Sequence, residues 1–572
     1  MEEINKEQEE SLAVKTKAVL VERILFGVSL VLIILVMLFF INKKEGFHCD
    51  EIFSYGSSNS TYSNVFYSDW KIDPEKVFFD EYVMQGNIFD IIGNVKKYYI
   101  DNTDEKDRLI REKADEQENT WRTREEAIDY MQVTGNGDAF NISSVYWNQI
   151  SDVHPPLFYA IVNVVSSVFQ NNSSKYIIFG INVVFFLLTA YFMRKILIEI
   201  DKKELSILTV LLYGLSIAGI STVVFLRMYM MLTFFTVVFL YLNIKIVKND
   251  FHVDKRKIIE LILTTVGGFL TQYFFCFYAL LVVIIMGIIF LIRKRYKELV
   301  KYVGIFVASA IIGLLIFPMS LYHMFFGERG VGFFANELYG PRLKAFTELI
   351  LNNFGANNII GIALLILSIF VVIIVKKKEN LPIFCLISIP VVCYIMIIAK
   401  IAPYVELRYI MNVLPITTIF VVMMVGSMFD NRTYEILLVA AMVIGLTGYG
   451  FITQKPSYLY EGYNKYLEVA EEYKDCDYVY VGYLLFNHIQ FLPEYMTYEN
   501  TMLMAQEDLW WIKDDEKLKN SDEFILGVEV TAANDEEVLK TVLEYTGFDK
   551  YEVLMEPGEV QDINNKIYRI YK

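Results

Sequence analysis

ILFGVSLVLIILVMLFFI, residues 24 to 41, is a strongly apolar run near the start of the chain. The hydrocarbon core of a bilayer is spanned by about 20 apolar residues in helical form, so this run predicts a membrane-spanning helix. An acidic segment, Met1–Glu10, precedes it, and no small-residue cleavage site follows. We therefore expect a retained anchor and not a cleaved signal peptide.

The stretch that follows the anchor is GFHCDEIFSYGSSNS, Gly46–Ser60. It places two adjacent carboxylates, Asp50 and Glu51, a few residues beyond the apolar run. Acidic side chains close to lipid are costly, which favours a functional role for the pair. A solvated acidic loop is the alternative interpretation of this stretch taken alone.

The composition is that of a membrane protein with large polar parts. Of the 572 residues, 55% are hydrophobic and 21% are charged. The net charge of -15 argues against a nucleic-acid partner. The five cysteines form no CxxC pair and the five histidines have no zinc-ligand spacing, so the sequence predicts no structural metal site.

Ten further apolar stretches follow, and with the anchor they predict about eleven spanning helices. We therefore expect an α-helical polytopic membrane protein with a long first extracytoplasmic loop that contains amphipathic helices. The ten stretches are Tyr176–Met193, Leu205–Leu226, Met228–Ile246, Ile258–Tyr273, Phe274–Ile292, Tyr302–Leu321, Ile359–Val375, Leu381–Ala399, Tyr409–Phe429 and Ile436–Phe451.

The apolar run that begins at HPPLFY, His154–Gln170, is short for a spanning helix and is predicted to be interfacial or re-entrant. The positive-inside rule supports this. Basic clusters follow alternate predicted helices and are all cytoplasmic only if this run does not cross; they are Arg194–Lys203, Lys245–Lys257, Arg293–Lys301 and Lys376–Lys378. Lys43 and Lys44, at the outer end of the anchor, argue against this orientation.

The predicted domains are a cytoplasmic segment 1–23, a transmembrane domain 24–454 whose residues 42–153 form the first loop, and a tail 455–572. Strands are predicted at Tyr478–Val481, Phe524–Val530 and Lys566–Tyr571, and helix or partial helix at Leu492–Trp511 and Glu536–Tyr545. The pattern of the tail is therefore typical of a small extracytoplasmic α/β domain. It has no glycine loop for phosphate, so we expect an accessory domain.

Chemistry-bearing side chains gather on the face that this topology makes extracytoplasmic. His154 stands before two prolines, which make a rigid turn. Arg227 with Tyr229, in FLRMYMML, and Arg408 with Tyr409, in VELRYIMNVLP, put a cation and a phenol into apolar surroundings. An arginine at a membrane edge either snorkels to the interface or binds an anion through its planar fork. Two such elements on the face that holds the acid pair favour anion binding.

Five of these segments together resemble the glycosyltransferase C superfamily, in the bacterial branch similar to protein O-mannosyltransferases and lipid A aminoarabinose transferases. The segments run in the same order from about Phe47 to Pro415; they are HCDEIFSYGSSNS, DVHPPLFY (Asp152–Tyr159), FLRMYMML, TQYFFCFYAL (Thr271–Leu280) and LRYIMNVLP. Many relatives have a histidine where Gln272 stands. The resemblance does not extend over the tail.

The resemblance implies an inverting transfer of a sugar from a polyprenyl-phosphate donor at the outer face of the plasma membrane. Asp50 is then the general base and Glu51 its positioning neighbour. Arg408 holds the donor phosphate with Arg227. The substrate-binding side chains implied are Asp152, His154, Tyr229, Tyr273 and Tyr409.

Three questions stay open from the sequence. Two adjacent acids form a small ligand set, so we expect no obligatory cofactor, with a divalent cation as the alternative. A transporter or flippase of lipid-linked saccharides shares the helix count and the lipid ligand and is the alternative function. The expected partners are the bilayer, the donor and an unidentified glycan, lipid or protein acceptor.

Overall fold

The computed structural model describes residues 2–61, 77–86, 88–115, 121–325, 339–356, 381–426, 428, 431–482, 487–558, 560 and 563–572. The chain forms two compact units. The first comprises Met1–Ile41, Phe179–Ile316 and Gly332–Ser457, and the second comprises Asn42–Ile178, Phe317–Val331 and Tyr458–Lys572.

The first unit is a helical membrane domain. Within the described residues, seven helices are long and apolar enough to span a bilayer, or eight if one bent pair counts as a single span. The seven are the anchor, Leu20–Lys43 of α1 (Glu2–Lys43), and α9 (Lys175–Glu199), α12 (Tyr229–Lys248), α14 (Phe274–Ile292), α15 (Tyr296–Ile316), α20 (Leu381–Ile401) and α22 (Arg432–Thr453).

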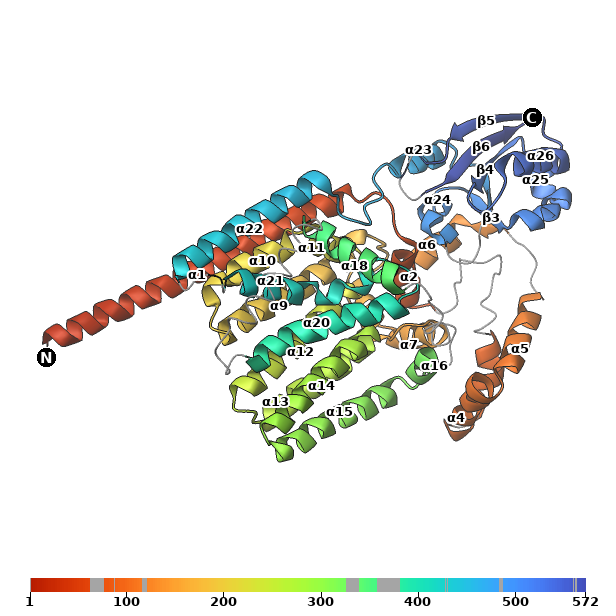
Figure 1. Ribbon diagram of the computed structural model, residues 1–572. Coiled ribbons are helices and arrows are strands. Elements are labelled where there is room, and N and C mark those ends of the chain that lie inside the picture. The colour runs from red at the N-terminus through yellow and green to blue at the C-terminus, as the bar shows by residue number, and fades with distance from the viewer. Residues whose placement is uncertain are drawn as a thin grey trace. The chain divides into compact units, whose positions relative to one another are not determined.

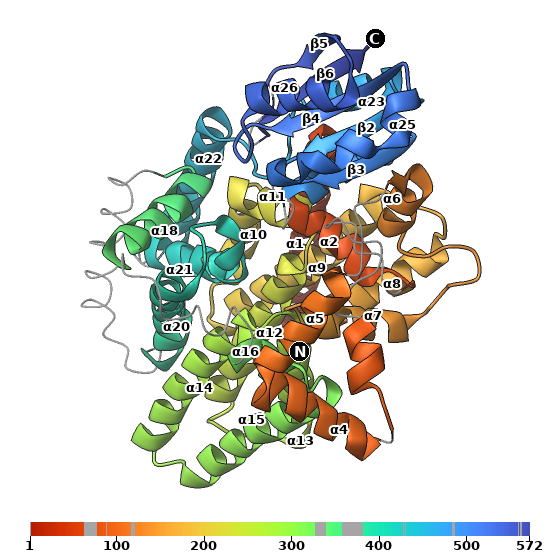
Figure 2. The same ribbon diagram turned by 90° about the vertical axis from the view of Figure 1, so that its right-hand side faces the viewer.

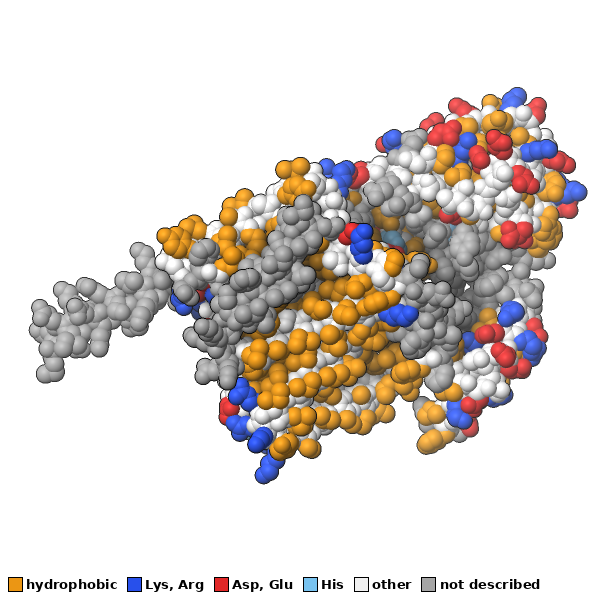
Figure 3. All heavy atoms as spheres, viewed as in Figure 1, with side chains coloured by type: hydrophobic (Ala, Val, Ile, Leu, Met, Phe, Trp, Pro, Cys, Tyr) orange, Lys and Arg blue, Asp and Glu red, His pale blue; other side chains and the backbone are white. Residues whose placement is uncertain are grey.

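Helices α12, α14, α15 and α13 (Lys255–Thr271) lie side by side in both views (Figures 1 and 2). One stripe of α15 stays exposed, at Val300, Val303, Val307, Ile311 and Leu315. These side chains recur every three or four residues and so occupy one helix face. Figure 3 shows a continuous hydrophobic surface over this part of the unit. The apolar exposure is that of a multi-pass membrane protein in contact with lipid.

Two predicted spans have a different form in the structure, and a third lies outside the described residues. Leu205–Leu226 is a pair, α10 (Ser206–Gly214) and α11 (Ile217–Val224), bent by 63°. The bend arises because Gly214 ends α10 and the Ser216 hydroxyl caps α11 by accepting from Gly219 N at 3.0 Å. Tyr409–Phe429 contains α21 (Leu414–Gly426), which has only 13 residues. The predicted span Ile359–Val375 lies outside the described residues, so the count of eleven stays a prediction.

The second unit contains a mixed six-stranded sheet in the order β1-β3-β2-β4-β6-β5. Strands β3 (Asn500–Met504), β2 (Asp477–Val481) and β4 (Glu523–Glu529) are parallel to one another. The antiparallel strands are β6 (Asn565–Tyr571), β5 (Lys550–Met555) and β1 (Arg122–Thr123). The expected strands at 478–481, 524–530 and 566–571 are confirmed.

The two faces of the sheet have different cores. Val479 and Val481 point to an aliphatic core that also contains Val538 and Val542 of α26 (Asp535–Thr546). Tyr478 and Tyr480 point the other way, because side chains alternate along a strand. They pack with Tyr495 of α24 (Leu492–Tyr495). In Figure 1, α26 and α23 (Asn464–Glu472) lie on opposite sides of the strands.

Two features of this sheet correct the sequence analysis. The segment 492–511 is predicted to be helical or partly helical; it is helical at α24 and at the 3-10 helix η7 (Gln506–Asp514), but between them it forms strand β3. Its Met and Leu residues favour helix intrinsically, and pairing on both sides overrides that preference. Strand β1 comes from the first loop, where Arg122 pairs with Thr501. The tail therefore shares its sheet with the first loop.

Apart from strand β1, the regular elements in the described part of the first loop are helices, as the sequence predicts. Its elements are α2 (Cys49–Ser58), η1 (Phe79–Val83), α4 (Ile88–Lys96), η2 (Lys97–Asp101), α5 (Thr103–Asp115), α6 (Arg124–Met131) and α7 (Ile142–Ser151). The run at HPPLFY forms α8 (Leu157–Val168), a 12-residue helix of the second unit that is too short to span.

Candidate active site

The acid pair lies in the first turn of α2, which begins with a capping box. The His48 ring accepts a hydrogen bond from Asp50 N through Nδ1 at 3.1 Å. The Glu51 carboxylate reaches back and accepts from His48 N at 2.7 Å. These two bonds satisfy N–H groups that the start of a helix leaves without partners. The sequence HCDE therefore fixes where α2 starts and how its first turn is oriented.

The two acids occupy different environments. Glu51 is completely buried, and its Oε2 lies 2.7 Å from the Nζ of Lys44, which is equally buried. Burial lowers the pKa of Lys44, and the neighbouring Glu51 carboxylate opposes that shift. The Asp50 side chain keeps 23% of its surface exposed. Glu51 is thus a structural anchor of α2, and Asp50 is the more accessible of the two carboxylates.

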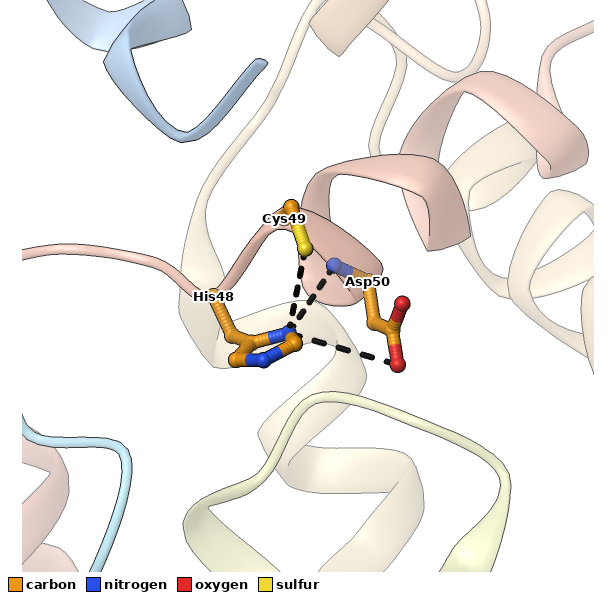
Figure 4. A group of neighbouring side chains, drawn as sticks. All are labelled: His48, Cys49 and Asp50. Atoms are coloured by element: carbon orange, nitrogen blue, oxygen red, sulfur yellow. Dashed lines mark hydrogen bonds and ion pairs between the residues drawn. The ribbon is translucent and has the colours of Figure 1, made fainter. Parts of the chain in front are cut away.

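His48, Cys49 and Asp50 place three ligand atoms within 4.8 Å of one another (Figure 4). The Cys49 Sγ lies 3.5 Å and the Asp50 Oδ2 4.0 Å from His48 Nδ1. A cation bound by all three atoms would take the Nδ1 lone pair that caps α2. Capping of α2 and binding of such a cation would therefore compete for His48 Nδ1.

The second half of the motif, Gly56–Ser60, is held by amide side chains. Asn163 of α8 donates to Ser58 O and to Ser60 Oγ, both at 3.0 Å. Asn59 donates to Asp129 O at 2.7 Å. Because these donors fix the backbone at the end of α2, the motif is locked at both ends, and α2 packs against α7 and α8.

The Asp152–His154 turn lies between α7 and α8, in the same unit. The Asp152 Oδ2 is 2.9 Å from His154 Nδ1, and only 10% of the His154 side chain is exposed. His323 of α16 (Ser320–Phe325) places its Nε2 3.1 Å from Ile150 O. Burial lowers the pKa of His323, while the Ile150 carbonyl and Asp152 oppose the shift. A carboxylate on Nδ1 fixes the orientation of the His154 ring.

Arg227 and Tyr229 lie in the first unit, where α12 begins. Both are almost completely buried, at 2% and 3% exposure. The preceding turn is held by Asn182 of α9, which donates to Val223 O at 3.1 Å and to Phe225 O at 2.9 Å. The Phe225 and Tyr229 rings stack at 5.6 Å. The guanidinium is therefore buried and does not snorkel into solvent.

Arg408 lies on a 3-10 turn, η4 (Leu407–Tyr409). Its Nε is 2.8 Å from Glu406 Oε2, and its Nη2 donates to Glu406 Oε1 at 3.1 Å. The guanidinium also lies 5.2 Å from the centre of the Tyr409 ring. Arg408 thus forms an ion pair with Glu406 that includes one hydrogen bond, from Nη2.

Tyr409 is joined to the start of α14. Its ring meets that of Phe274 at 5.4 Å, and its carbonyl accepts from Tyr394 OH at 2.9 Å. Tyr273 precedes Phe274, and its N–H donates to Gln272 Oε1 at 2.7 Å. The structure thus places Tyr409 against Phe274, the neighbour of Tyr273 in the sequence, and gives Gln272 a local backbone contact.

The predicted residues fall into one group per unit. Asp50, Glu51, Asp152 and His154 belong to the second unit; Arg227, Tyr229, Tyr273, Arg408 and Tyr409 belong to the first. Their meeting at one site stays a prediction. The sequence analysis missed Lys44 as a partner of Glu51; the signal was a lysine seven residues before a carboxylate at the end of an apolar helix.

Comparisons with known proteins find structural likeness alone. Two crystal structures of ArnT from Cupriavidus metallidurans are similar to this chain, one bound to undecaprenyl phosphate and one in the apo state. Each covers 73% of this chain and 87% of its own at 11% identity, with TM-scores of 0.45 and 0.41. No family model matches the sequence. No curated protein matches it significantly. The functional proposal accordingly rests on the residues of this chain.

Proposed function

We propose that this protein is an inverting membrane glycosyltransferase that moves a sugar from a polyprenyl-phosphate donor to an acceptor hydroxyl on the extracytoplasmic side. The observation that carries the proposal is the contrast within the acid pair. Glu51 is buried and bound to Lys44, whereas the adjacent Asp50 carboxylate stays partly open at a fixed helix start. A carboxylate held in this way suits a general base.

The reaction is a single displacement. Asp50 takes the proton of the acceptor hydroxyl while the acceptor oxygen bonds to the anomeric carbon from the face opposite the phosphate. The bond between that carbon and the phosphate oxygen breaks, and its electron pair leaves with the polyprenyl phosphate. Arg408, supported by Arg227, stabilises the charge that develops on the departing phosphate.

The remaining predicted side chains bind the sugar or the acceptor. His154, oriented by Asp152, offers Nε2, and Tyr229, Tyr273 and Tyr409 offer ring faces and hydroxyls. Glu51 positions the first turn of α2. For the donor phosphate to use the fork of Arg408, the Glu406 carboxylate has to give way or share it.

We propose that transfer needs no obligatory metal, because the cluster around Asp50 uses His48 Nδ1 for capping. Activity of the purified protein is therefore expected to persist after dialysis against EDTA. Loss of activity that Mg²⁺, Mn²⁺ or Zn²⁺ restores would contradict this part of the proposal.

The test of the function uses the full chain in detergent or nanodiscs with radiolabelled polyprenyl-phosphate hexoses and pentoses. The acceptor source is the cell-envelope fraction of a strain that lacks the protein, and mass spectrometry of that envelope identifies the missing modification. Asp50→Asn is expected to abolish transfer. Asp101→Asn, which alters an exposed ion pair with Lys96 in the same loop, is the matched control. An Asp50→Asn protein that folds and keeps full activity would refute the proposal.

One structural feature bears on the alternative function as a flippase. Transporters often contain broken helices that recur in both halves of the fold. The described part of the chain has one bent pair, α10 and α11, and it brings no charged residue into the bend. Passage of labelled lipid-linked sugar across vesicles without transfer would favour the flippase.

A further inference from the structure

Residues 45–48, which lead into α2, contact a short stretch of the tail, Tyr458–Asn464, which we name the clasp. Glu45 N donates to Leu459 O at 2.9 Å. The Glu45 carboxylate accepts from Gly462 N at 2.6 Å. On the other side of α2's N-terminus, the His48 ring packs edge-on against the Tyr458 ring at 5.8 Å. The start of α2 and the clasp are therefore joined by backbone and side-chain contacts.

Lys44 is the buried link between the clasp and the acid pair. Its Nζ donates both to the Glu51 carboxylate and to the carbonyl of Tyr458. The ammonium also lies over the rings of Phe47 and Tyr460, at 5.7 and 5.5 Å from their centres. A fully buried ion pair is a poor source of stability, because desolvation offsets the attraction. The best-attested role of a buried ion pair is to favour one conformation of the chain over its alternatives.

The clasp backbone is strained where it meets Lys44. Tyr458 and Tyr460 have φ angles of 69° and 52°, in the left-handed region that disfavours residues with a side chain. Such conformations persist where the surroundings determine them, and they cluster at functional sites. In this conformation the Tyr458 carbonyl accepts a hydrogen bond from Lys44 Nζ.

The clasp is tied in turn to the core of the tail. The Tyr463 hydroxyl donates to Glu494 Oε1 at 2.9 Å, and the Tyr466 hydroxyl donates to Asn565 O, in β6, at 2.8 Å. Tyr463, Tyr466 and Glu494 are all buried. The contacts thus run from the sheet through the clasp and Lys44 to Glu51.

We propose that Lys44 is a positioning residue for Asp50 and that the tail serves catalysis by holding α2 through it. This inference rests on the proposed function, because it assigns the base to Asp50. The tail is then an internal support for the reacting carboxylate and not an accessory domain. Lys44 acts through Glu51 and the α2 backbone and does not touch substrate.

The experiment compares Lys44→Met with Lys465→Met, a matched change of an exposed lysine on α23. Two readouts are used on the full chain: transfer kinetics, and hydrogen–deuterium exchange of the peptide 47–58. Lys44→Met is expected to lower the rate at saturating donor by about tenfold or more, since misplacement by about 1 Å can cost on the order of a hundredfold. The KM for the donor is expected to stay within about twofold, and exchange in 47–58 to rise, because α2 loses its link to the clasp. Lys465→Met is expected to match wild type in both readouts.

A second variant tests whether Lys44 positions α2 or only neutralises the charge of Glu51. Lys44→Met combined with Glu51→Gln leaves no uncompensated buried charge, and the amide oxygen of the introduced glutamine can still accept from His48 N. We expect this protein to express and melt like wild type but to keep the low rate and the raised exchange. Full recovery of the rate would mean that Lys44 only neutralises Glu51, and would overturn the inference.

The two proposals fail in different ways. Full activity of Asp50→Asn would overturn the proposed function. An inactive Asp50→Asn together with a wild-type rate and unchanged exchange in Lys44→Met would overturn only the positioning role.

Discussion

The substitution Gly46→Ala, which adds one methyl group, tests whether close contact between the clasp and the start of α2 is needed for transfer. A Cβ built there would lie 2.9 Å from Tyr460 Cβ and 3.0 Å from Tyr463 Cγ. Carbon atoms in contact are usually separated by about 3.5–4.0 Å, so the chain must open by roughly 0.5–1 Å. The Tyr460 Cβ is fixed to a backbone with a left-handed φ and cannot turn away. Gly46→Ala therefore pushes the clasp and the start of α2 apart.

The expected size of the effect follows from that opening. Overpacking of a tight contact costs about 1–3 kcal/mol. A shift of up to about 1 Å passed on to Asp50 lowers the transfer rate by roughly 10- to 100-fold, since catalysis depends steeply on the placement of the reacting groups. Donor binding is expected to change little, because Arg408 belongs to the other compact unit.

The assay is the rate of transfer at saturating donor, with thermal unfolding of the detergent-solubilised chain measured in parallel. Gly93→Ala is the control, since a Cβ at Gly93, in helix α4 of the same loop, meets nothing within 4 Å. A folded Gly46→Ala protein with the wild-type rate would refute the idea that the clasp places Asp50.

Three further predictions can be checked on the same preparation. Burial raises the pKa of Glu494 from 4.5 to about 8, so the folded chain retains a proton that the unfolded chain releases. The tail should therefore lose stability as pH rises from about 4.5 to about 8, by up to ~1.4 kcal/mol per pH unit, and Glu494→Gln should flatten this dependence in thermal melts. Arg408→Lys cannot reproduce a forked contact and should weaken binding of undecaprenyl phosphate by about tenfold or more in a calorimetric titration; unchanged affinity would remove Arg408 from the donor site. Cysteines introduced in place of Asp50 and Arg408, in a chain without other cysteines, should be joined by a bifunctional maleimide of about 10 Å reach if both residues line one site, and absence of the cross-link with single-cysteine labelling intact would contradict their convergence.

Local patterns were sufficient for most elements of the fold. The anchor, six further apolar helices long enough to span a bilayer, and three strands of the tail follow from periodicity and hydrophobicity, and each is present at its expected position. The same is true of the short helix after His154, whose length alone excludes a span. The start of α2 could also have been foreseen, because an acceptor at His48 with Glu51 three residues later follows the spacing of a capping box.

Contacts between residues far apart in the chain could not be predicted from local sequence patterns. Three of the five residues of strand β3 are Met or Leu, which favour helix, and pairing with its neighbours β1 and β2 makes it a strand. Strand β1 is two residues long and lies more than 350 residues away in sequence from its partner, so no local signal marks it. Lys44 binds the carbonyl of Tyr458 across 414 residues. Read locally, that lysine is simply a basic residue at the end of a membrane helix.

The acid pair shows why neighbours in sequence have different tasks. Successive residues of a helix point about 100° apart, so the side chains of Asp50 and Glu51 leave α2 in different directions. Glu51 lies on the buried face of α2 with Ile52 and Tyr55, and its longer side chain reaches back to His48 N and Lys44. Glu51→Asp would remove one methylene, leaving the carboxylate too short for both contacts and Lys44 buried without its full partner. The shorter acid at position 50 and the longer one at position 51 are therefore not interchangeable, and exchanging them should disable transfer even though charge and composition are unchanged.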